Sequence, residues 1–239
     1  MQTYKDFETR TEFIRYLDLY KPESNPDFVK IDQIDPTKYA LDLEQILKNI
    51  DVVKDTWNNQ SAYAIEQSVA KIGSKQLDIM QGQKIEKLRA GYKSNQAMFR
   101  VSNCSSDSYF QEFAQHIGLE NSLARYHVQF PGEVTAWHTD IFSPSHEFLK
   151  SYPNEAEEDV GKDKNIRRII IALQDWDWGH FLVFGHSPWQ NWQAGQVIYW
   201  EYGVPHGSAN IGYTPRISVS ITGQASAKFY EKCKNAIKP

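Results

Sequence analysis

The amino-acid sequence predicts a β-rich core, either a sandwich or a barrel, covered by helices from the N-terminal half of the chain. Apolar residues recur at helical spacing up to about residue 117 and alternate at strand spacing from about residue 121. Six of the seven Trp residues lie between Trp137 and Trp200, and aromatic residues favour strands and a compact interior. No Pro/Gly/Ser-rich linker interrupts the 239 residues. We therefore expect one domain, with mainly helical support in 1–120, the core in 121–223 and a C-terminal tail in 224–239.

Three segments of the N-terminal part are predicted to be helical. Asp35 and Pro36 mark a helix start after the irregular, Pro-containing stretch "YKPESNPDFVKIDQIDP", because Pro is favoured at the first helical positions. Residues 61–73 carry apolar side chains at spacings of four and three and end in a Gly. Residues 105–118 begin with Ser and Asp as possible caps, present a Phe/Phe/Ile stripe, and also end in a Gly.

From about residue 121 the chain has the pattern of short strands separated by Gly or Pro. A Pro-Gly pair after the first of them predicts a tight turn, and residues 167–176 form a near-continuous apolar run that fits a strand buried on both faces. The long stretch from Ile141 to Lys164, acidic in its middle, is interpreted as a lid or binding loop. The predicted strands lie in "SLARYHVQFPG", "VTAWHTD", "RRIIIALQDW", "HFLVFG", "QVIYWEY" and "RISVSITG".

The overall charge and the cysteines argue against several classes of protein. A net charge of −4 gives no attraction to a phosphate backbone, and the basic stretches 84–93 and 162–168 are interpreted as a solvated helix face and a loop, so a nucleic-acid partner is not expected. Cys104 and Cys233 have no CxxC neighbours, which leaves neither a thiolate metal cluster nor a disulfide framework. The N-terminus lacks an apolar signal segment, and no apolar run is long enough to span a membrane. We expect a cytoplasmic protein without a membrane partner.

His138 and Asp140, in the stretch "VTAWHTDIF", are candidates for a metal site. In a strand, residues two apart point to the same face, so an imidazole and a carboxylate would converge there. Alone, the two could equally be a buried hydrogen-bonded pair. His206 supplies a third candidate ligand, and two His with one carboxylate form the facial triad that suits non-haem Fe(II). Ten residues later, Arg216 opens an alternating strand with Ser218 on the same face, and its planar fork suits a carboxylate.

The order His-x-Asp, His, and then Arg-x-Ser ten residues further on resembles the Fe(II)/2-oxoglutarate-dependent oxygenase superfamily. The stretches "WGHFLVFG" and "WQAGQVIYWEYGVPHGSANIGYTPRISVSI" are similar to the family's Gly-containing strand and to its succession of Gly-turn, strand, Pro-His and Arg-strand. The resemblance covers roughly residues 121–223. It implies a double-stranded β-helix, a cupin-like jelly roll, with the N-terminal helices packed on it. Nothing specific to the family is recognised in the first hundred residues.

The resemblance implies a catalytic centre in which His138, Asp140 and His206 bind Fe(II). It also implies that Arg216, with Ser218, holds the far carboxylate of 2-oxoglutarate. The implied activity is that of a dioxygenase, an oxidoreductase that uses O2 and 2-oxoglutarate to hydroxylate an unactivated C–H bond and releases succinate and CO2. The expected substrate is a peptide or protein side chain, an amino acid or a small metabolite. The carboxylate at position 140 argues against halogenation, and Arg rather than Lys at position 216 argues against the collagen-type prolyl hydroxylases.

Side chains near this centre are candidates for further contacts. Tyr126, on the strand before the His-x-Asp strand, is predicted to reach the 2-oxoglutarate carboxylates, and Gln129 and Arg168 are secondary candidates for the same role. His127 alternates with Tyr126 and is expected to face the other way and pack. Asn210 has either a turn role or a contact with the co-substrate. Packing is favoured over a place at the mouth of the site for His180, His186, Trp176 and Trp178.

Two other classes of protein stay open on the sequence. A non-catalytic cupin would bind a metal or a sugar and would use Arg216 as a structural ion-pair partner. A structural jelly roll, as in capsid or lectin domains, would bind no metal. Consumption of O2 and 2-oxoglutarate would separate the enzyme from both classes. The sequence leaves the oligomeric state open.

Overall fold

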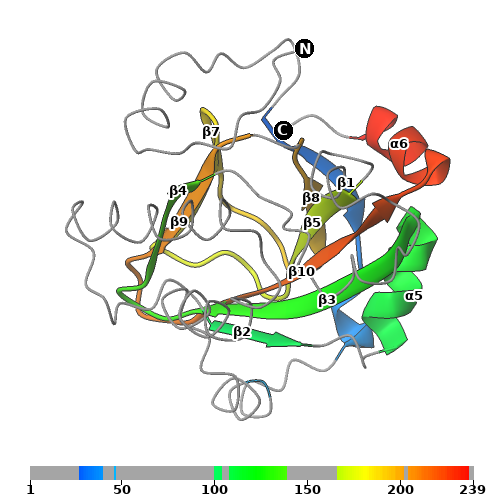
Figure 1. The fold of residues 1–239 in the computed structure, drawn as a ribbon. Helices are drawn as coiled ribbons and strands as arrows, with labels where there is room; N and C mark the ends of the chain where they lie inside the picture. The colour runs from blue at the N-terminus through cyan, green and yellow to red at the C-terminus, as the bar shows by residue number, and fades with distance from the viewer. Residues whose placement is uncertain are drawn as a thin grey trace, which may run out of the picture.

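The computed structural model of the chain describes residues 27–39, 46, 100–103, 108–138, 166–201 and 204–236. Figure 1 shows the arrangement of the elements within these ranges. In chain order they are β1 (Val29–Gln33), the 3-10 helix η1 (Pro36–Lys38), β2 (Arg100–Asn103), α5 (Ser108–Ile117), β3 (Leu119–Gln129), β4 (Val134–His138), β5 (Ile166–Ala172), β6 (His180–Phe184), β7 (Ser187–Trp189), β8 (Gln196–Tyr199), β9 (His206–Asn210), β10 (Arg216–Ala225) and α6 (Ala227–Lys234).

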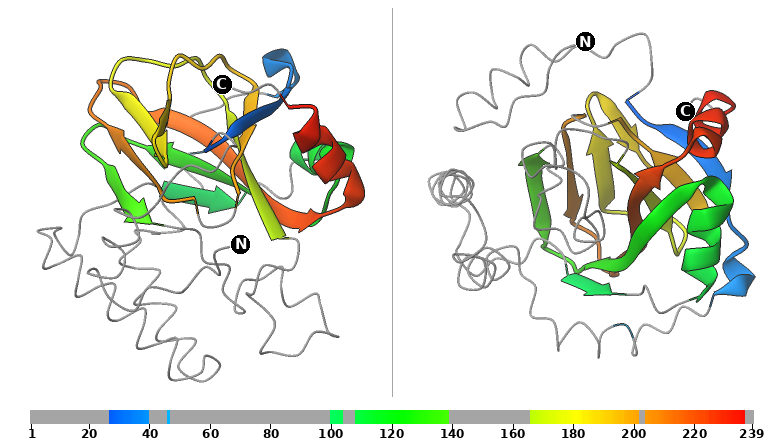
Figure 2. Two further views of the ribbon diagram at one scale, coloured as in Figure 1. Left: turned by 90° about the horizontal axis from the view of Figure 1, so that it is seen from above. Right: turned by 45° about the vertical axis from the view of Figure 1, so that its right-hand side comes forward.

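The strands form two antiparallel sheets that face each other (Figure 2). One sheet has the order β1-β8-β5-β10-β3-β2, and the other has the order β4-β9-β6-β7. From β3 onward the chain passes repeatedly from one sheet to the other, so that β3, β5, β8 and β10 lie in the larger sheet and β4, β6, β7 and β9 in the smaller one. This alternation is the double-stranded β-helix that the sequence predicted.

Strand β10 has one apolar face and one polar face. Ile217, Val219 and Ile221 belong to the hydrophobic cluster that also holds the buried residues of α5, so they point toward the helices. The alternate positions, from Arg216 to Thr222, point to the opposite side because the side-chain period of a strand is two. All of these residues are buried, which means that both faces of the strand are covered.

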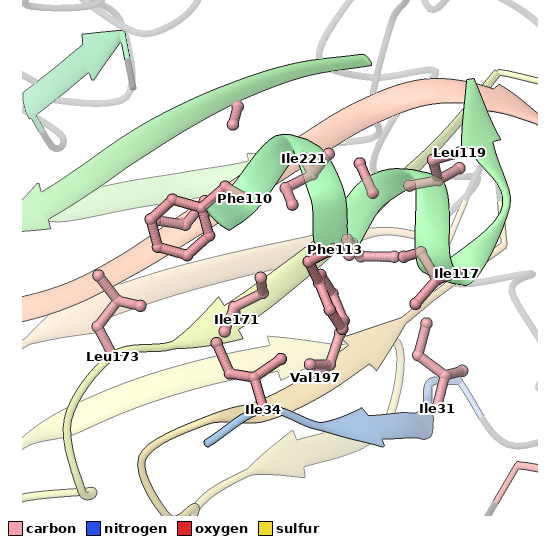
Figure 3. Close-up of a cluster of buried hydrophobic side chains, with 14 of the residues drawn as sticks. Ile31, Ile34, Phe110, Phe113, Ile117, Leu119, Ile171, Leu173, Val197 and Ile221 are labelled. Carbon is pink, nitrogen blue, oxygen red and sulfur yellow. The ribbon is translucent and has the colours of Figure 1, made fainter. Parts of the chain in front are cut away.

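Helices α5 and α6 cover the outer face of the larger sheet, as Figures 1 and 2 show. Figure 3 shows Phe110 and Phe113 of α5 directed at the sheet, where Ile171 of β5 and Val197 of β8 lie. The helix predicted over 105–118 is therefore confirmed as Ser108–Ile117. Its apolar side chains recur at spacings of three and four, which place them on one face of the helix.

A second hydrophobic cluster joins the two sheets. It contains Ile170 and Ile198 from the larger sheet and Phe184 from the smaller one. Three tryptophans belong to it, and all three are buried: Trp189, Trp192 and Trp200. The aromatic-lined interior predicted from the Trp distribution is confirmed for this cluster, whereas Trp137 and Trp178 are exposed.

The N-terminal part of the core differs from the prediction in two respects. Residues 29–33, expected to be irregular, form strand β1, because this short segment pairs with β8 and buries Ile31 against the helices. The helix start predicted at Asp35 is correct in position, but the helix is a single 3-10 turn. The Asp35 carboxylate accepts hydrogen bonds from the backbone N–H (2.9 Å) and the hydroxyl (2.7 Å) of Thr37. Strand β2 likewise lies in the part expected to be mainly helical.

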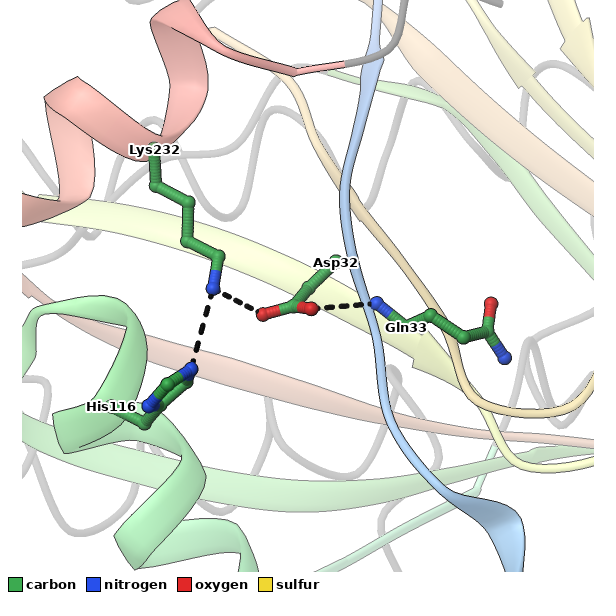
Figure 4. A network of polar contacts seen from close by, with 4 residues as sticks. All are labelled: Asp32, Gln33, His116 and Lys232. Carbon is green, nitrogen blue, oxygen red and sulfur yellow. Dashed lines mark hydrogen bonds and ion pairs between the residues drawn. The ribbon is translucent and has the colours of Figure 1, made fainter.

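The C-terminal tail is also more ordered than predicted. Residues 227–234 form α6, whose Phe229 is fully buried and packs edge-on against Tyr199 at 5.1 Å between ring centroids. Lys232 of α6 makes an ion pair with Asp32 of β1 and lies 3.5 Å from His116 Nε2 of α5 (Figure 4). These contacts join both helices to the edge strand of the larger sheet.

Several predictions concern residues outside the described ranges. They are the helix over 61–73, most of the helical support within 1–120, the basic stretch 84–93 and the loop from Ile141 to Lys164. Neither described α-helix is long and apolar enough to cross a lipid bilayer.

The packing of α5 on the larger sheet gives a direct test of this fold. The variant Phe110→Ala should lower the free energy of unfolding by about 3–5 kcal/mol, because it opens a cavity under a fully buried ring. Chemical denaturation followed by circular dichroism would measure the change. The control Gln115→Ala, at an exposed position of the same helix, should leave stability within about 0.5 kcal/mol of wild type. Equal stability of the two variants would contradict the assignment of α5 to the core.

Candidate active site

The backbone register brings two of the predicted metal ligands together. Strand β9 begins at His206 and pairs with β4 on one side and β6 on the other. In this register His206 lies opposite His138 of β4 and opposite Phe184 of β6. Residues directly opposite each other in an antiparallel pair share a face of the sheet, so positions 138 and 206 are neighbours on one face. This is the arrangement that the predicted facial triad requires of its two His positions.

The His206 side chain has the form of a metal ligand. Its Nδ1 lies 2.9 Å from the Val204 carbonyl oxygen, which can only accept, so Nδ1 carries the proton. In the neutral imidazole, Nε2 then has the lone pair that a metal ion needs. The ring is buried and held between Phe184 (5.6 Å, 23°) and Trp200 (5.2 Å, 59°). The imidazole of His206 is therefore held in the tautomer that a metal ligand needs.

The predicted carboxylate ligand, Asp140, lies outside the described residues, and only the backbone of His138 is described. Within the part of the chain that the structure describes, no three His, Cys, Asp or Glu side chains gather closely enough to hold a metal ion. The complete triad of His138, Asp140 and His206 accordingly stays a prediction.

The predicted Pro-Gly turn aligns β4 with β9. The backbone N–H of Glu133 donates to the Phe130 carbonyl at 3.0 Å, and Gly132 has φ +86°, as the third residue of a type II turn requires. The N–H of Gly132 donates to the Asn210 carbonyl at 2.7 Å, which ties the turn to the end of β9. The Glu133 carboxylate accepts from the Phe130 N–H at 2.7 Å and closes the turn.

Arg216 places a positive charge between the two sheets. Its side chain is 6% exposed, and its Nε and Nη2 lie 3.2 Å and 2.9 Å from Gln129 Oε1. Nη2 also lies 3.3 Å from the Ser208 hydroxyl. Burial lowers the pKa of the guanidinium to about 9, so it is still protonated at neutral pH. No carboxylate among the described residues pairs with it, and a buried charge without a counterion favours an anionic ligand.

Ser208 links the arginine to the histidine, and the sequence analysis missed it. It lies two residues after His206 on β9 and therefore on the same face of the strand. Its hydroxyl accepts from Arg216 Nη2 (3.3 Å) and from Gln129 Nε2 (3.2 Å). The guanidinium thus contacts a residue that lies about 7 Å along the strand from His206. The spacing of two from His206 was the available signal in the sequence.

The remaining predicted cofactor-binding residues fall on opposite faces of the larger sheet. Ser218 is buried two residues after Arg216, on the same face of β10. Tyr126 lies opposite Val219, which belongs to the outer face, and its ring packs edge-on against Phe110 at 6.0 Å. The structure therefore does not bring Tyr126 together with Arg216, and its predicted contact with the co-substrate is not supported by this placement.

His127 takes the inner position on β3 that was expected of Tyr126. It lies opposite Ser218 in the register, and its Nε2 is 2.9 Å from the Ser220 hydroxyl. The alternation of β3 was predicted correctly, but its phase was reversed, because Tyr126 and His127 are both amphipathic and the sequence does not say which faces the helices. Arg168 also lies on the inner face, further along the sheet, where its Nε donates to the Thr222 hydroxyl at 2.9 Å.

Asn210 has the turn role rather than a place in the site. Its Nδ2 donates to the carbonyls of Gln129 and Thr214, both at 2.8 Å, and its Oδ1 accepts from the Gly212 N–H at 3.0 Å. The amide thereby closes the connection between β9 and β10 and fixes the start of β10, where Arg216 lies.

His180 closes the interior next to this connection. It is fully buried, its Nε2 lies 3.0 Å from the Thr214 carbonyl oxygen, and its ring stacks on Trp192 at 6.3 Å and 11°. Burial lowers the pKa of His180, and the positive charge of Arg216 adds to this shift. His186, by contrast, is exposed, as is Trp178, whose ring lies 5.1 Å from Trp176.

Comparisons with known proteins find similar solved structures at low sequence identity. No protein-family model and no curated protein matches the chain. One similar solved structure is the non-haem α-ketoglutarate-dependent epimerase SnoN from nogalamycin biosynthesis, at 13% identity over 60% of this chain and 69% of that chain, with a TM-score of 0.40. A prolyl-4-hydroxylase of Pseudomonas putida is similar at 15% identity over 54% and 72%, with a TM-score of 0.37. A Cupin 2 conserved barrel domain protein of Salinispora arenicola is similar at 13% identity over 57% and 84%, with a TM-score of 0.31.

The neutral state of His180 predicts a pH dependence of stability. Since the pKa of His180 is lower in the folded protein than in the unfolded chain, the unfolded chain takes up the proton first as the pH falls below about 6.5. The free energy of unfolding should therefore decrease between about pH 7 and pH 5, and His180→Phe should show a smaller decrease. Urea unfolding of both proteins across this range would measure it. Identical slopes for the two proteins would contradict the assignment.

Proposed function

We propose that the chain is an Fe(II)- and 2-oxoglutarate-dependent dioxygenase that hydroxylates an unactivated C–H bond. The observation that carries the proposal is the buried Arg216 guanidinium, which has no carboxylate partner among the described residues. It contacts Ser208, which lies two residues after His206 on β9. A buried cation near an imidazole that is in the tautomer of a metal ligand suits a molecule that is both a metal chelator and a carboxylate. 2-Oxoglutarate is such a ligand.

Each residue of the proposed site has a definite role. His206 would bind Fe(II) through Nε2, together with His138 and Asp140, and the hydrogen bond to Val204 holds its ring in place. The bound metal would supply the activation of O2, coupled to the conversion of 2-oxoglutarate to succinate and CO2. Phe184 and Trp200 cover the imidazole and exclude water from its surroundings.

The guanidinium of Arg216 would hold the far carboxylate of 2-oxoglutarate. Gln129 accepts from Nε and Nη2, and Ser208 accepts the other N–H of Nη2, which leaves the two N–H groups of Nη1 to donate to a carboxylate. His206 and Ser208, which contacts Arg216, are about 7 Å apart along β9. This spacing is compatible with a five-carbon dicarboxylate that reaches from the metal to the guanidinium. The Ser218 hydroxyl, on the same face, would be a further donor to that carboxylate.

The proposed substrate remains a peptide or protein side chain, an amino acid or a small metabolite, in a cytoplasmic setting. The alternative, a non-catalytic cupin that binds a metal or a sugar, uses Arg216 as a structural ion-pair partner. That role finds no support in the described residues, where the contacts of Arg216 are to the neutral groups of Gln129 and Ser208.

Anaerobic titration with Fe(II) and 2-oxoglutarate tests the proposal. The wild type should develop the visible charge-transfer absorption of an Fe(II)–2-oxoglutarate chelate, and His206→Ala should not. Arg216→Met should need about 10- to 100-fold more 2-oxoglutarate, since it loses a charge-assisted hydrogen bond to the carboxylate.

The exposed His186→Ala is the matched control and should titrate like the wild type. Absence of the absorption from the wild type at saturating metal and 2-oxoglutarate would overturn the proposal. In that case the binding-module alternative would take its place.

A further inference from the structure

Gln129 is a buried polar side chain of the site that is held at both ends. It is fully buried on β3, directly opposite Arg216 of β10 in the register. Its Oε1 accepts from both Nε (3.2 Å) and Nη2 (2.9 Å) of Arg216, and its Nε2 donates to the Ser208 hydroxyl at 3.2 Å. Its backbone carbonyl accepts from Asn210 Nδ2 at 2.8 Å. Both ends of the amide and the backbone are thus fixed.

A carboxylate oxygen could occupy the position of Gln129 Oε1. A Glu at position 129 would have nearly the same shape and would receive the same two N–H groups of Arg216, in the geometry of an Arg–carboxylate pair. That pair would cancel the buried positive charge and remove the reason for an external anion to bind. An amide oxygen orients the guanidinium equally well, but it leaves the charge in place.

We propose that Gln129 is a positioning residue that holds the guanidinium of Arg216 in place for the ligand while keeping its charge uncompensated. The inference rests on the proposed function in one respect, since it identifies the anion as the far carboxylate of 2-oxoglutarate. It extends that function by assigning the selectivity for dicarboxylic over monocarboxylic 2-oxo acids to the neutrality of residue 129. Ser208 completes the arrangement, because its hydroxyl accepts from both Gln129 Nε2 and Arg216 Nη2.

The experiment compares the affinities of three proteins for two ligands. The ligands are 2-oxoglutarate and 2-oxovalerate, which has the same length but a methyl group in place of the far carboxylate. The proteins are wild type, Gln129→Glu and the uncharged, similarly sized Gln129→Met. Anaerobic binding in the presence of Fe(II) gives the affinity of each pair.

The wild type should bind 2-oxoglutarate about 10- to 100-fold more tightly than 2-oxovalerate, as expected for a hydrogen-bonded carboxylate on a buried charge. Gln129→Glu should lose this preference, with its affinity for 2-oxovalerate unchanged. Gln129→Met should keep part of the preference, because it loses the orientation but retains the charge. A purely structural role would instead weaken both ligands equally in both variants, and that result would overturn the inference.

A second readout does not require metal or turnover. Glutarate, which has both carboxylates but no oxo group, should raise the thermal unfolding temperature of the wild type and not that of Gln129→Glu. Stabilisation of both proteins by glutarate would refute the role of Gln129 and leave the proposed function intact. Stabilisation of the wild type alone, without any Fe(II)–2-oxoglutarate absorption, would refute the proposed function and leave the role of Gln129 intact. If Gln129→Glu does not fold, equal selectivity of Gln129→Met and wild type would still refute the inference.

Discussion

The burial of the Arg216 charge between two sheets is the constraint on which the rest of the site depends. Strand β10 presents Ile217, Val219 and Ile221 to the helices, and their packing under α5 fixes the rotation of the strand about its own axis. With that rotation fixed, the period of two directs Arg216 and Ser218 into the space between the sheets. The apolar face, which shapes the fold, thus also determines where the charge lies.

The side chains that surround this charge are neutral in the part of the chain that the structure describes. Gln129 and Ser208 offer oxygen atoms to the guanidinium without opposing its charge. Burial lowers the pKa of His180 below its ordinary value of 6.5, so this imidazole is uncharged at neutral pH. Burial also lowers the pKa of Arg216 to about 9, which leaves the guanidinium protonated. A single uncompensated charge in a medium of low dielectric attracts a carboxylate far more strongly than it would in water.

The sequence predicted those features that depend on alternation and spacing along one strand. The common face of Arg216 and Ser218 follows from the period of two along β10, whereas the pairing of position 138 with His206 depends on the strand register, which the sequence analysis did not predict. The phase of β3 could not be predicted, because Tyr126 and His127 are equally able to face the helices or the interior, and only the packing against Phe110 decides between them. Strand β1 and helix α6 were missed because short segments depend on their tertiary partners.

The most direct test of the central claim is a crystal structure of the protein grown without oxygen in the presence of Fe(II) and 2-oxoglutarate. The account predicts a metal ion bonded to His206 Nε2. It also predicts the far carboxylate of 2-oxoglutarate within hydrogen-bonding distance of Nη1 of Arg216, with Gln129 Oε1 still accepting from Nε and Nη2. A 2-oxoglutarate molecule bound away from Arg216, or a guanidinium paired with a carboxylate of the chain itself, would contradict it.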